Sequence, residues 1–174
     1  MSEKLNEYRM PAEWEAQDST WIVWPYNKND WPGLYQYIPD VILEIISKIS
    51  KNQKVNLIID DSAKSIKKLI KNKKIKNINF HKIKTDRIWL RDSGPIFLIN
   101  KKNKKKIILN FGFNGWAKYN NYKNDNKIND NISKITKLKK INPIMKKNNN
   151  TRKIIMEGGA FDINGHGSIL LTEE

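Results

Sequence analysis

Three short stretches of this sequence contain residues whose types and spacing could support chemistry. Residues 89–95, WLRDSGP, place the charged pair Arg91-Asp92 between apolar residues and a Gly-Pro turn. Residues 110–116 read NFGFNGW, and the carboxylate of Glu157 stands directly before two glycines. Each stretch lies beside an apolar run that reads as a strand, and loops next to strands can hold functional side chains without disturbing a core.

Asp92 and Glu157 are the carboxylates of most interest in these stretches. Removing a carboxylate from water costs several kcal/mol unless the group is paired. Each is therefore either bound to a partner inside the protein or held for a cationic ligand. The internal partner of Asp92 would be Arg91 or Arg87, and that of Glu157 would be backbone N–H groups. Spacing alone leaves these alternatives open.

The elements that must position these groups alternate in the first half of the chain, which predicts an α/β domain. Trp14 and Trp31 are expected to be aromatic core anchors. The expected strands are 20–24, 54–59 and 75–83, and the expected helices are 34–51 and a second one from the capping residue Ser62 to 71.

The second half reads as a hairpin, an amphipathic helix and three more strands. The hairpin strands are 95–100 and 106–111, residues 148–150 form a surface loop, and a glycine turn surrounds Asn164-Gly165. This order is closer to repeated strand-strand-helix-strand units than to a doubly wound parallel sheet. The helix is predicted from apolar residues at helical spacing, namely Ile128, Ile132, Ile135 and Leu138.

The composition excludes several classes of protein. A chain of 174 residues with 39% hydrophobic and 10% aromatic residues can form one domain with a real core, which disordered chains cannot. The absence of cysteine excludes disulfides, thiolate metal sites and a cysteine nucleophile within these residues. The sequence has no membrane-length apolar run and no secretory signal, so we expect a cytoplasmic location.

The net charge of +15 would ordinarily suggest nucleic acid. However, only Arg9, Arg87, Arg91 and Arg152 among the 33 cations can offer a bidentate fork. Lys, Asn and Ile share A/T-rich codons, so a biased genome could produce the excess. We therefore expect no specific nucleic-acid partner, only non-specific binding at low salt.

The order of the blocks MPAEWE, WIVWP, WPG, IWLRDSGP, FGFNGWAKY and MEGG…GHGSILLTEE resembles the agmatine deiminase and bacterial-type peptidyl-arginine deiminase family. This family belongs to the guanidino-group-modifying superfamily. The resemblance implies the pentein fold, a five-fold pseudosymmetric α/β propeller of strand-strand-helix-strand units. It also implies that residues 1–174 are the N-terminal portion of a single deiminase domain whose C-terminal portion is absent. The end of the chain directly after an expected strand, which leaves a sheet edge exposed, agrees with that expectation.

The family hydrolyses a guanidinium group through a cysteine thiolate, with a histidine and a glutamate handling protons. The resemblance implies that Glu157 is the catalytic glutamate and Asp92 one of two aspartates that hold the planar cation. Trp89 would flank the substrate, and Asn114 and Trp116 would line the pocket. No metal or organic cofactor is implied.

The sequence departs from the family in having no cysteine and no His-x-Asp. His81 is expected to be a surface residue and His166 a turn residue. The chain alone is therefore expected to be inactive, and a separately encoded C-terminal half is an expected partner, with homo-oligomers and self-association also expected.

We expect the substrate to be agmatine rather than peptidyl-arginine, and the pathway to be putrescine and polyamine biosynthesis. A peptide substrate has a carboxylate that must be bound, and residues 110–119 contain no arginine and only Lys118 as a cation. Four alternatives remain: protein citrullination, a non-catalytic remnant that acts as a binding or structural module, amidino transfer, and a basic nucleic-acid-binding domain.

Overall fold

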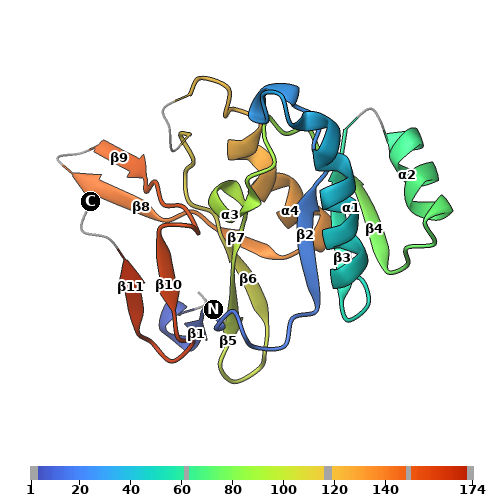
Figure 1. Ribbon diagram of the computed structural model, residues 1–174. Coiled ribbons are helices and arrows are strands. Elements are labelled where there is room, and N and C mark those ends of the chain that lie inside the picture. The colour runs from blue at the N-terminus through green and yellow to red at the C-terminus, as the bar shows by residue number, and fades with distance from the viewer. Residues whose placement is uncertain (1–3, 61–62, 116–118, 148–149, 172–174) are drawn as a thin grey trace. The chain divides into compact units, whose positions relative to one another are not determined.

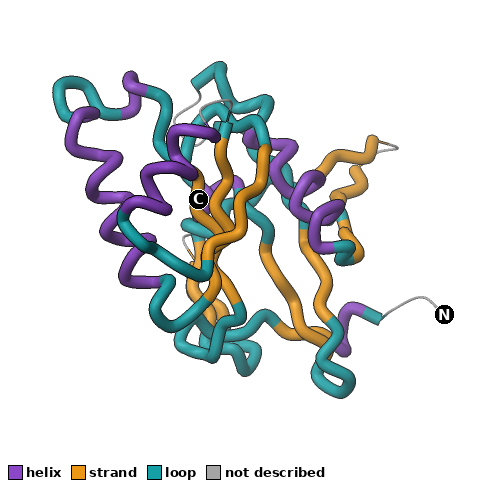
Figure 2. The backbone as a smooth tube through the Cα atoms, turned by 90° about the vertical axis from the view of Figure 1, so that its right-hand side faces the viewer, coloured by secondary structure: helices purple, strands orange, loops and turns teal. Residues whose placement is uncertain are grey.

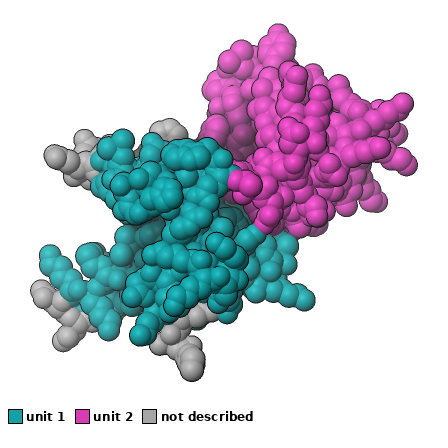
Figure 3. Space-filling view, turned by 90° about the horizontal axis from the view of Figure 1, so that it is seen from below, with its two compact units in different colours: residues 1–15, 91–174 teal, residues 16–90 magenta. Residues whose placement is uncertain are grey.

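The computed structural model of the chain, drawn in Figure 1, describes residues 4–60, 63–115, 119–147 and 150–171. The backbone forms two compact units, which we consider separately. Unit 1 comprises residues 1–15 and 91–174, and unit 2 comprises residues 16–90. Figure 3 shows the two in different colours. The sequence of unit 1 is therefore interrupted by the whole of unit 2.

Unit 2 is a parallel sheet with two helices. Its strands β2 (Ser19–Val23), β3 (Lys54–Ile59) and β4 (Ile78–Lys82) lie in the order β2-β3-β4. Helix α1 (Ile38–Ile49) connects the first two strands and α2 (Ala63–Asn72) the last two. The predicted strand and helix order of this half is confirmed. The predicted capping residue Ser62 lies outside the described residues.

The core of unit 2 forms between the two helices and one face of the sheet (Figure 2). Strand β3 is the central strand of the sheet and is buried after its exposed first residue Lys54, with Leu57 fully buried. Helix α1 contributes Leu43 and Ile46, and α2 contributes Ile66 and Ile70. The buried residues of each helix face the sheet, and the opposite side of α1 exposes Val41 and Ile45.

His81 lies at the end of β4 and is half-buried, which corrects the prediction of a surface histidine. Its ring is tilted against Trp21 with 4.8 Å between the ring centroids, and its Nε2 is 3.0 Å from Oδ1 of Asn56. Burial lowers the pKa of the imidazole below its usual value. Trp21, Asn56 and His81 all belong to unit 2, so the contacts of His81 help to hold the sheet of that unit together.

Unit 1 contains a four-stranded sheet in the order β1-β5-β6-β7. Strand β1 (Tyr8–Arg9) pairs with β5 (Ile96–Asn100), which forms an antiparallel hairpin with β6 (Lys106–Leu109). Helix α4 (Ile128–Thr136) then leads to β7 (Lys139–Ile141), which runs parallel to β6. The segment from β5 to β7 is therefore one complete strand-strand-helix-strand unit.

Two of the four apolar residues that predicted the helix α4 do not belong to its buried face. Ile128 and Ile132 are fully buried, but Ile135 is 42% exposed. Leu138 lies beyond the helix, because Lys137 adopts the left-handed conformation and ends it.

Unit 1 also contains two hairpins, β8 (Ile144–Lys147) with β9 (Asn150–Lys153) and β10 (Phe161–Ile163) with β11 (Ile169–Leu171). The short helix α3 (Leu90–Ser93) begins at the last residue of unit 2, and its other residues belong to unit 1. The predicted loop 148–150 is corrected at Asn150, which begins β9; its other two residues lie outside the described part. Strand β11 is exposed throughout.

Trp14 is 77% exposed, so the prediction that it anchors a core is wrong. Trp31, in unit 2, does join an aromatic cluster with Tyr35 and Trp89. No helix among the described residues is long and apolar enough to span a membrane.

Candidate functional site

Asp92 and Glu157 are each held by a short, well-defined piece of unit 1. Asp92 lies in α3, next to the buried Ser93. Glu157 follows an isolated parallel bridge between Gly112 and Ile155, and its carbonyl accepts a 3.0 Å hydrogen bond from the N–H of Ala160. The bridge and the turn fix the backbone on both sides of Glu157.

Two glycines bring the segment of Glu157 directly onto the segment of Asp92. A Cβ atom on Gly158 would lie 2.5 Å from the carbonyl oxygen of Arg91. A Cβ atom on Gly159 would lie 2.6 Å from Oδ1 of Asp92. A side chain at either position would force its neighbour to shift, the backbone of Arg91 at position 158 and the carboxylate of Asp92 at position 159, so the glycine pair allows a close approach of the two segments.

Burial makes both carboxyl groups harder to ionise, and the charge of Asp92 adds to the effect on Glu157. Burial raises the pKa of Asp92, and the positive charge of Arg91 opposes this increase only in part. Burial also raises the pKa of Glu157, and the negative charge of Asp92 raises it further. A cation bound beside both groups would reverse this effect by favouring their charged forms.

Neither carboxylate has an internal partner within the part of the chain that the structure describes. No hydrogen bond or ion pair to the side chain of Asp92 or of Glu157 occurs there. The arginines that could have neutralised Asp92 are paired elsewhere, because Arg91 binds Glu13 and Arg87 binds Asp30. The geometry therefore favours carboxylates held for a cationic ligand over carboxylates with structural partners.

Arg91 was not foreseen as an organising residue of this site. Its guanidinium pairs with Glu13 of the N-terminal segment and lies 3.7 Å from the carboxylate of Asp162 in β10. Its backbone carbonyl meets Gly158. Three separate segments are thus held together at the residue preceding Asp92. The position of an arginine directly before the aspartate was the signal available in the sequence.

The other predicted site residues are Trp89, Asn114 and Trp116. Trp89 belongs to unit 2, where its ring packs against Trp31 with 5.6 Å between the ring centroids. Asn114 is exposed in unit 1, and no hydrogen bond or ion pair within the described ranges joins it to Asp92 or Glu157. Trp116 lies outside the described residues.

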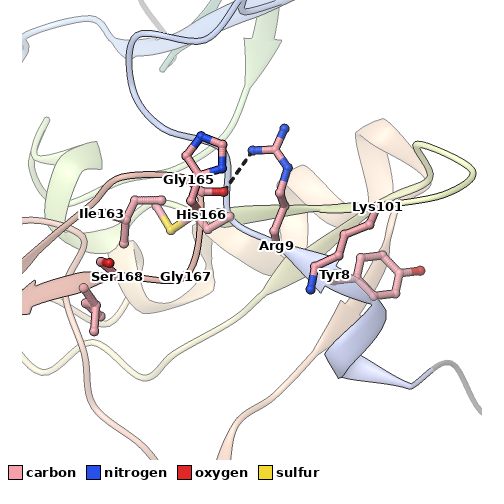
Figure 4. A pocket seen from close by; sticks show the side chains of 10 residues that line it. Tyr8, Arg9, Lys101, Ile163, Gly165, His166, Gly167 and Ser168 are labelled. Carbon is pink, nitrogen blue, oxygen red and sulfur yellow. Dashed lines mark hydrogen bonds between the residues drawn. The ribbon is translucent and has the colours of Figure 1, made fainter.

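A separate pocket of about 400 Å³ lies in unit 1 between β1 and the turn that joins β10 to β11 (Figure 4). Its most prominent cation, Arg9, donates to Oε2 of Glu15 at 2.7 Å and to the carbonyl of Gly165 at 3.4 Å. The hydrogen bond from Arg9 lowers the pKa of Glu15 to about 2, with a second contribution from the backbone N–H of Ala12.

His166 is exposed in the turn that lines this pocket, as predicted. Neither Asp92 nor Glu157 lines this pocket, and Arg9 is already neutralised, so we assign the candidate site to the two carboxylates instead. No group of three or more metal-ligating side chains occurs in the described ranges.

Comparison with known proteins gives matches over nearly the whole chain. Residues 9–174 match the Porphyromonas-type peptidyl-arginine deiminase family. The agmatine deiminase of Pseudomonas fluorescens is 26% identical over 176 residues, a match that covers 98% of this chain and 45% of that protein. The chain therefore spans about half the length of the curated relatives it matches.

Solved structures give the same picture. An agmatine deiminase variant of C. jejuni, solved with substrate bound, is 30% identical with a TM-score of 0.74 and covers 94% of this chain and 45% of its own. An agmatine deiminase of Enterococcus faecalis is 22% identical with a TM-score of 0.77 over 97% of this chain and 44% of its own, a likeness of fold. These matches confirm the predicted fold class, an α/β fold that forms part of the pentein propeller.

Proposed function

Because this chain belongs to the Porphyromonas-type peptidyl-arginine deiminase family, we propose that it supplies the guanidinium-binding side of an agmatine deiminase active site. The proposed reaction converts agmatine and water into N-carbamoylputrescine and ammonia, a step that would serve putrescine and polyamine synthesis. The observation that carries the proposal is the close approach of two carboxylates, Asp92 and Glu157, that have no internal partner in the described part of unit 1.

In this proposal each carboxylate has a different role. Asp92 accepts paired hydrogen bonds from the planar guanidinium, the geometry that this cation prefers. Glu157 accepts a proton during the reaction and orients the histidine that shares the work. Trp89, Asn114 and Trp116 would complete the binding surface around the substrate. The electrostatic support is that burial and the negative charge of Asp92 raise the pKa of Glu157, and a bound cation would oppose both effects.

The covalent step requires groups that these 174 residues do not contain. A cysteine thiolate would attack the guanidinium carbon, ammonia would leave with the proton it gains, and water would then break the carbon–sulfur bond and restore the thiolate. The sequence has no cysteine. We propose that residues 1–174 are the N-terminal portion of one deiminase domain and that the nucleophile, the His-x-Asp pair and the second aspartate are contributed by other residues, in a longer protein or a separately encoded half.

Agmatine is favoured over an arginine peptide because agmatine has no carboxylate to bind. The family name points to peptidyl-arginine, whereas the curated relative from P. fluorescens is an agmatine deiminase. No arginine occurs in 110–119 to bind a peptide carboxylate. Competition between agmatine and a peptide with C-terminal arginine in the complete enzyme would decide the substrate, and faster turnover of the peptide would overturn the preference for agmatine.

The binding half of the proposal can be tested on the chain as it is. In an NMR titration, agmatine should shift the backbone signals around Asp92 and Glu157, whereas putrescine, which lacks the guanidinium, should shift them much less. Asp92→Asn should abolish the difference. Asp40→Asn, which removes the same charge from an exposed position in α1, should leave it intact. Equal responses to both ligands, or an unchanged response in Asp92→Asn, would refute the assignment.

The catalytic half needs a separate assay. The chain alone should release no ammonia from agmatine above the uncatalysed background, because it lacks a nucleophile. The protein isolated from its native cells, analysed by intact mass and assayed for ammonia release, should be either longer than this chain or accompanied by a second polypeptide that supplies the cysteine. Ammonia release by the pure 174-residue chain would contradict the mechanism. An inactive native protein of 20.5 kDa with no such partner would favour a non-catalytic remnant.

A further inference from the structure

Unit 2 carries a dense group of lysines that the proposed reaction does not use. The segment 63–76 reads AKSIKKLIKNKKIK and contains no aspartate or glutamate. Its lysines are Lys64, Lys67, Lys68, Lys71, Lys73, Lys74 and Lys76, and every one of them is exposed. We call these seven residues the α2 lysine face.

The packing of α2 holds the lysines of the helix away from the core. Ile66 and Ile70 are each 3% exposed and are anchored in the core of unit 2. The helix therefore cannot turn its apolar side outward, and the lysines on its other side remain in solvent. The last three lysines continue the same charge into the connection to β4, where Lys74 takes the left-handed conformation. Figure 1 shows α2 and β4 joined by this connection.

The described residues leave the charges of this face without an opposite charge paired to them. No ion pair to any of the seven lysines occurs among the described residues, whereas Lys140 in unit 1 is paired with Asp130. The Nζ atom of Lys67 lies 5.3 Å from the centroid of the Phe80 ring, a cation–π contact within unit 2. Like charges four positions apart on a helix, as in Lys64–Lys68 and Lys67–Lys71, destabilise it. A polyanion laid along the face would remove this repulsion.

We propose that the α2 lysine face binds the phosphate backbone of nucleic acid without reading its sequence. Lysine ammonium groups act as point charges and suit phosphates, while the absence of arginine from the face removes the bidentate fork that reads guanine. Insertion into a membrane surface requires an apolar face that is available to lipid, and that of α2 is buried in the core. This inference concerns unit 2 and does not depend on agmatine binding by unit 1.

The alternative is that only the net positive charge of the chain attracts nucleic acid, so that every exposed lysine contributes equally to binding. A charge-matched pair of variants separates the two explanations. The first replaces Lys64, Lys67, Lys68 and Lys71 with glutamine, and the control replaces the exposed residues Lys102, Lys104, Lys134 and Lys146 with glutamine. Glutamine has nearly the helix propensity of lysine, so both variants should fold, which a thermal melt would check.

The assay is fluorescence anisotropy of short labelled poly(U) RNA and of a mixed-sequence single strand between about 50 and 200 mM KCl. The α2 variant should bind at least tenfold more weakly at the lower salt concentration, and its slope of log K against log salt should be shallower by about 3, at roughly 0.7 per lost phosphate contact. The control variant should bind like the wild type, and the two sequences should bind equally.

Three results would overturn the proposal. Equal losses in both variants would mean that only net charge matters. A strong preference for one sequence would mean base reading. Tighter binding to phosphatidylserine vesicles than to RNA would assign the face to a membrane surface. NMR mapping of RNA on the wild-type protein gives an independent measurement, in which the backbone signals of α2 and of 73–76 should shift most; shifts confined to unit 1 would refute the inference.

Discussion

Alanine at the two glycines beside Glu157 provides a direct test of how the candidate site is assembled. Neither Gly158 nor Gly159 has a positive φ, so alanine is compatible with their backbone conformations and any cost is steric. The obstacles differ in kind. The new methyl at position 158 meets the carbonyl oxygen of Arg91, which is backbone, and that at position 159 meets a carboxylate oxygen of Asp92, which is a side chain.

The structure allows the two costs to be separated. Ordinary contacts of a Cβ atom lie at 3.4 Å or more, so the 2.5 Å contact at position 158 requires a backbone shift of about 1 Å. Overpacking of this kind costs about 1–3 kcal/mol, or roughly 2–4 °C in Tm for each kcal/mol in a chain of this size. At position 159 the carboxylate of Asp92 can rotate away, so the loss of stability should stay below about 1 kcal/mol. That rotation moves the group proposed to bind the guanidinium.

Urea unfolding and agmatine titration together measure both effects. Gly158→Ala should lower the free energy of unfolding by about 1–3 kcal/mol. Gly159→Ala should leave it nearly unchanged but weaken the NMR response to agmatine. Ala160→Ser, at the next and exposed position, is the control and should alter neither quantity. An unchanged unfolding free energy in Gly158→Ala, or a larger loss in Gly159→Ala, would show that the two segments do not approach as described.

Three further predictions concern charge and packing. Burial raises the pKa values of Asp92 and Glu157, so their ionised forms destabilise the folded chain above the raised pKa, and this penalty vanishes as the pH falls below the ordinary pKa of each group. Asp92→Asn and Glu157→Gln should therefore have a higher Tm than the wild type at pH 7 and the same Tm at low pH. A lower Tm of either variant at pH 7 would contradict this prediction. The pKa of Glu15 is lowered from 4.5 to about 2, so its stabilisation is complete above about 4.5 and is lost as pH falls toward 2; an acid titration of Glu15→Gln should lack that part of the loss, and identical acid curves would argue against the Arg9 pair. Ile46→Ala, at a fully buried position in α1, should cost about 2–5 kcal/mol in urea unfolding, whereas Ile45→Ala on the exposed side should cost far less, and similar losses would contradict the burial pattern.

Much of unit 2 could be predicted from local pattern. Strand β3 has the predicted bounds 54–59, because a short run rich in valine, leucine and isoleucine that ends at Asp60 favours a buried strand. The helix α1 follows from apolar residues at helical spacing, but that spacing does not give its buried face, which includes Leu43 whereas Val41 and Ile45 are exposed. In both cases the signal lies within a dozen neighbouring residues.

The errors arose where distant contacts decide the outcome. Trp14 was assigned to a core by residue type, but its neighbours Glu13 and Glu15 are bound by Arg91 and Arg9, and it remains exposed between them. Leu138 continues the helical spacing of α4, but that spacing cannot show that the left-handed Lys137 ends the helix before it. Ile135 lies within the helix, and its spacing could not show that this position stays exposed.

The candidate site could be predicted in its residues but not in its construction. Asp92 and Glu157 were named from the motifs around them, and their roles remain predictions. Spacing could not reveal that the glycines after Glu157 lie against Arg91 and Asp92, because that contact joins segments far apart in the chain. It also could not decide between an ion pair and an open carboxylate, which depends on where Arg87 and Arg91 find their partners.

The interrupted sequence of unit 1 sets an order of events during synthesis on the ribosome. All three strands of unit 2 come from one continuous stretch, so its sheet can close once residue 82 has emerged. Strand β1 has to wait, because Arg9 pairs with Ile99, which at translation rates of 5–20 residues per second is made roughly 5–18 seconds later. During that interval the N-terminal segment, with Trp14 and Glu13, is nascent chain without its partners. A chaperone that recognises exposed aromatic residues would therefore have its best opportunity to bind at the start of this chain, before Arg91 has been added.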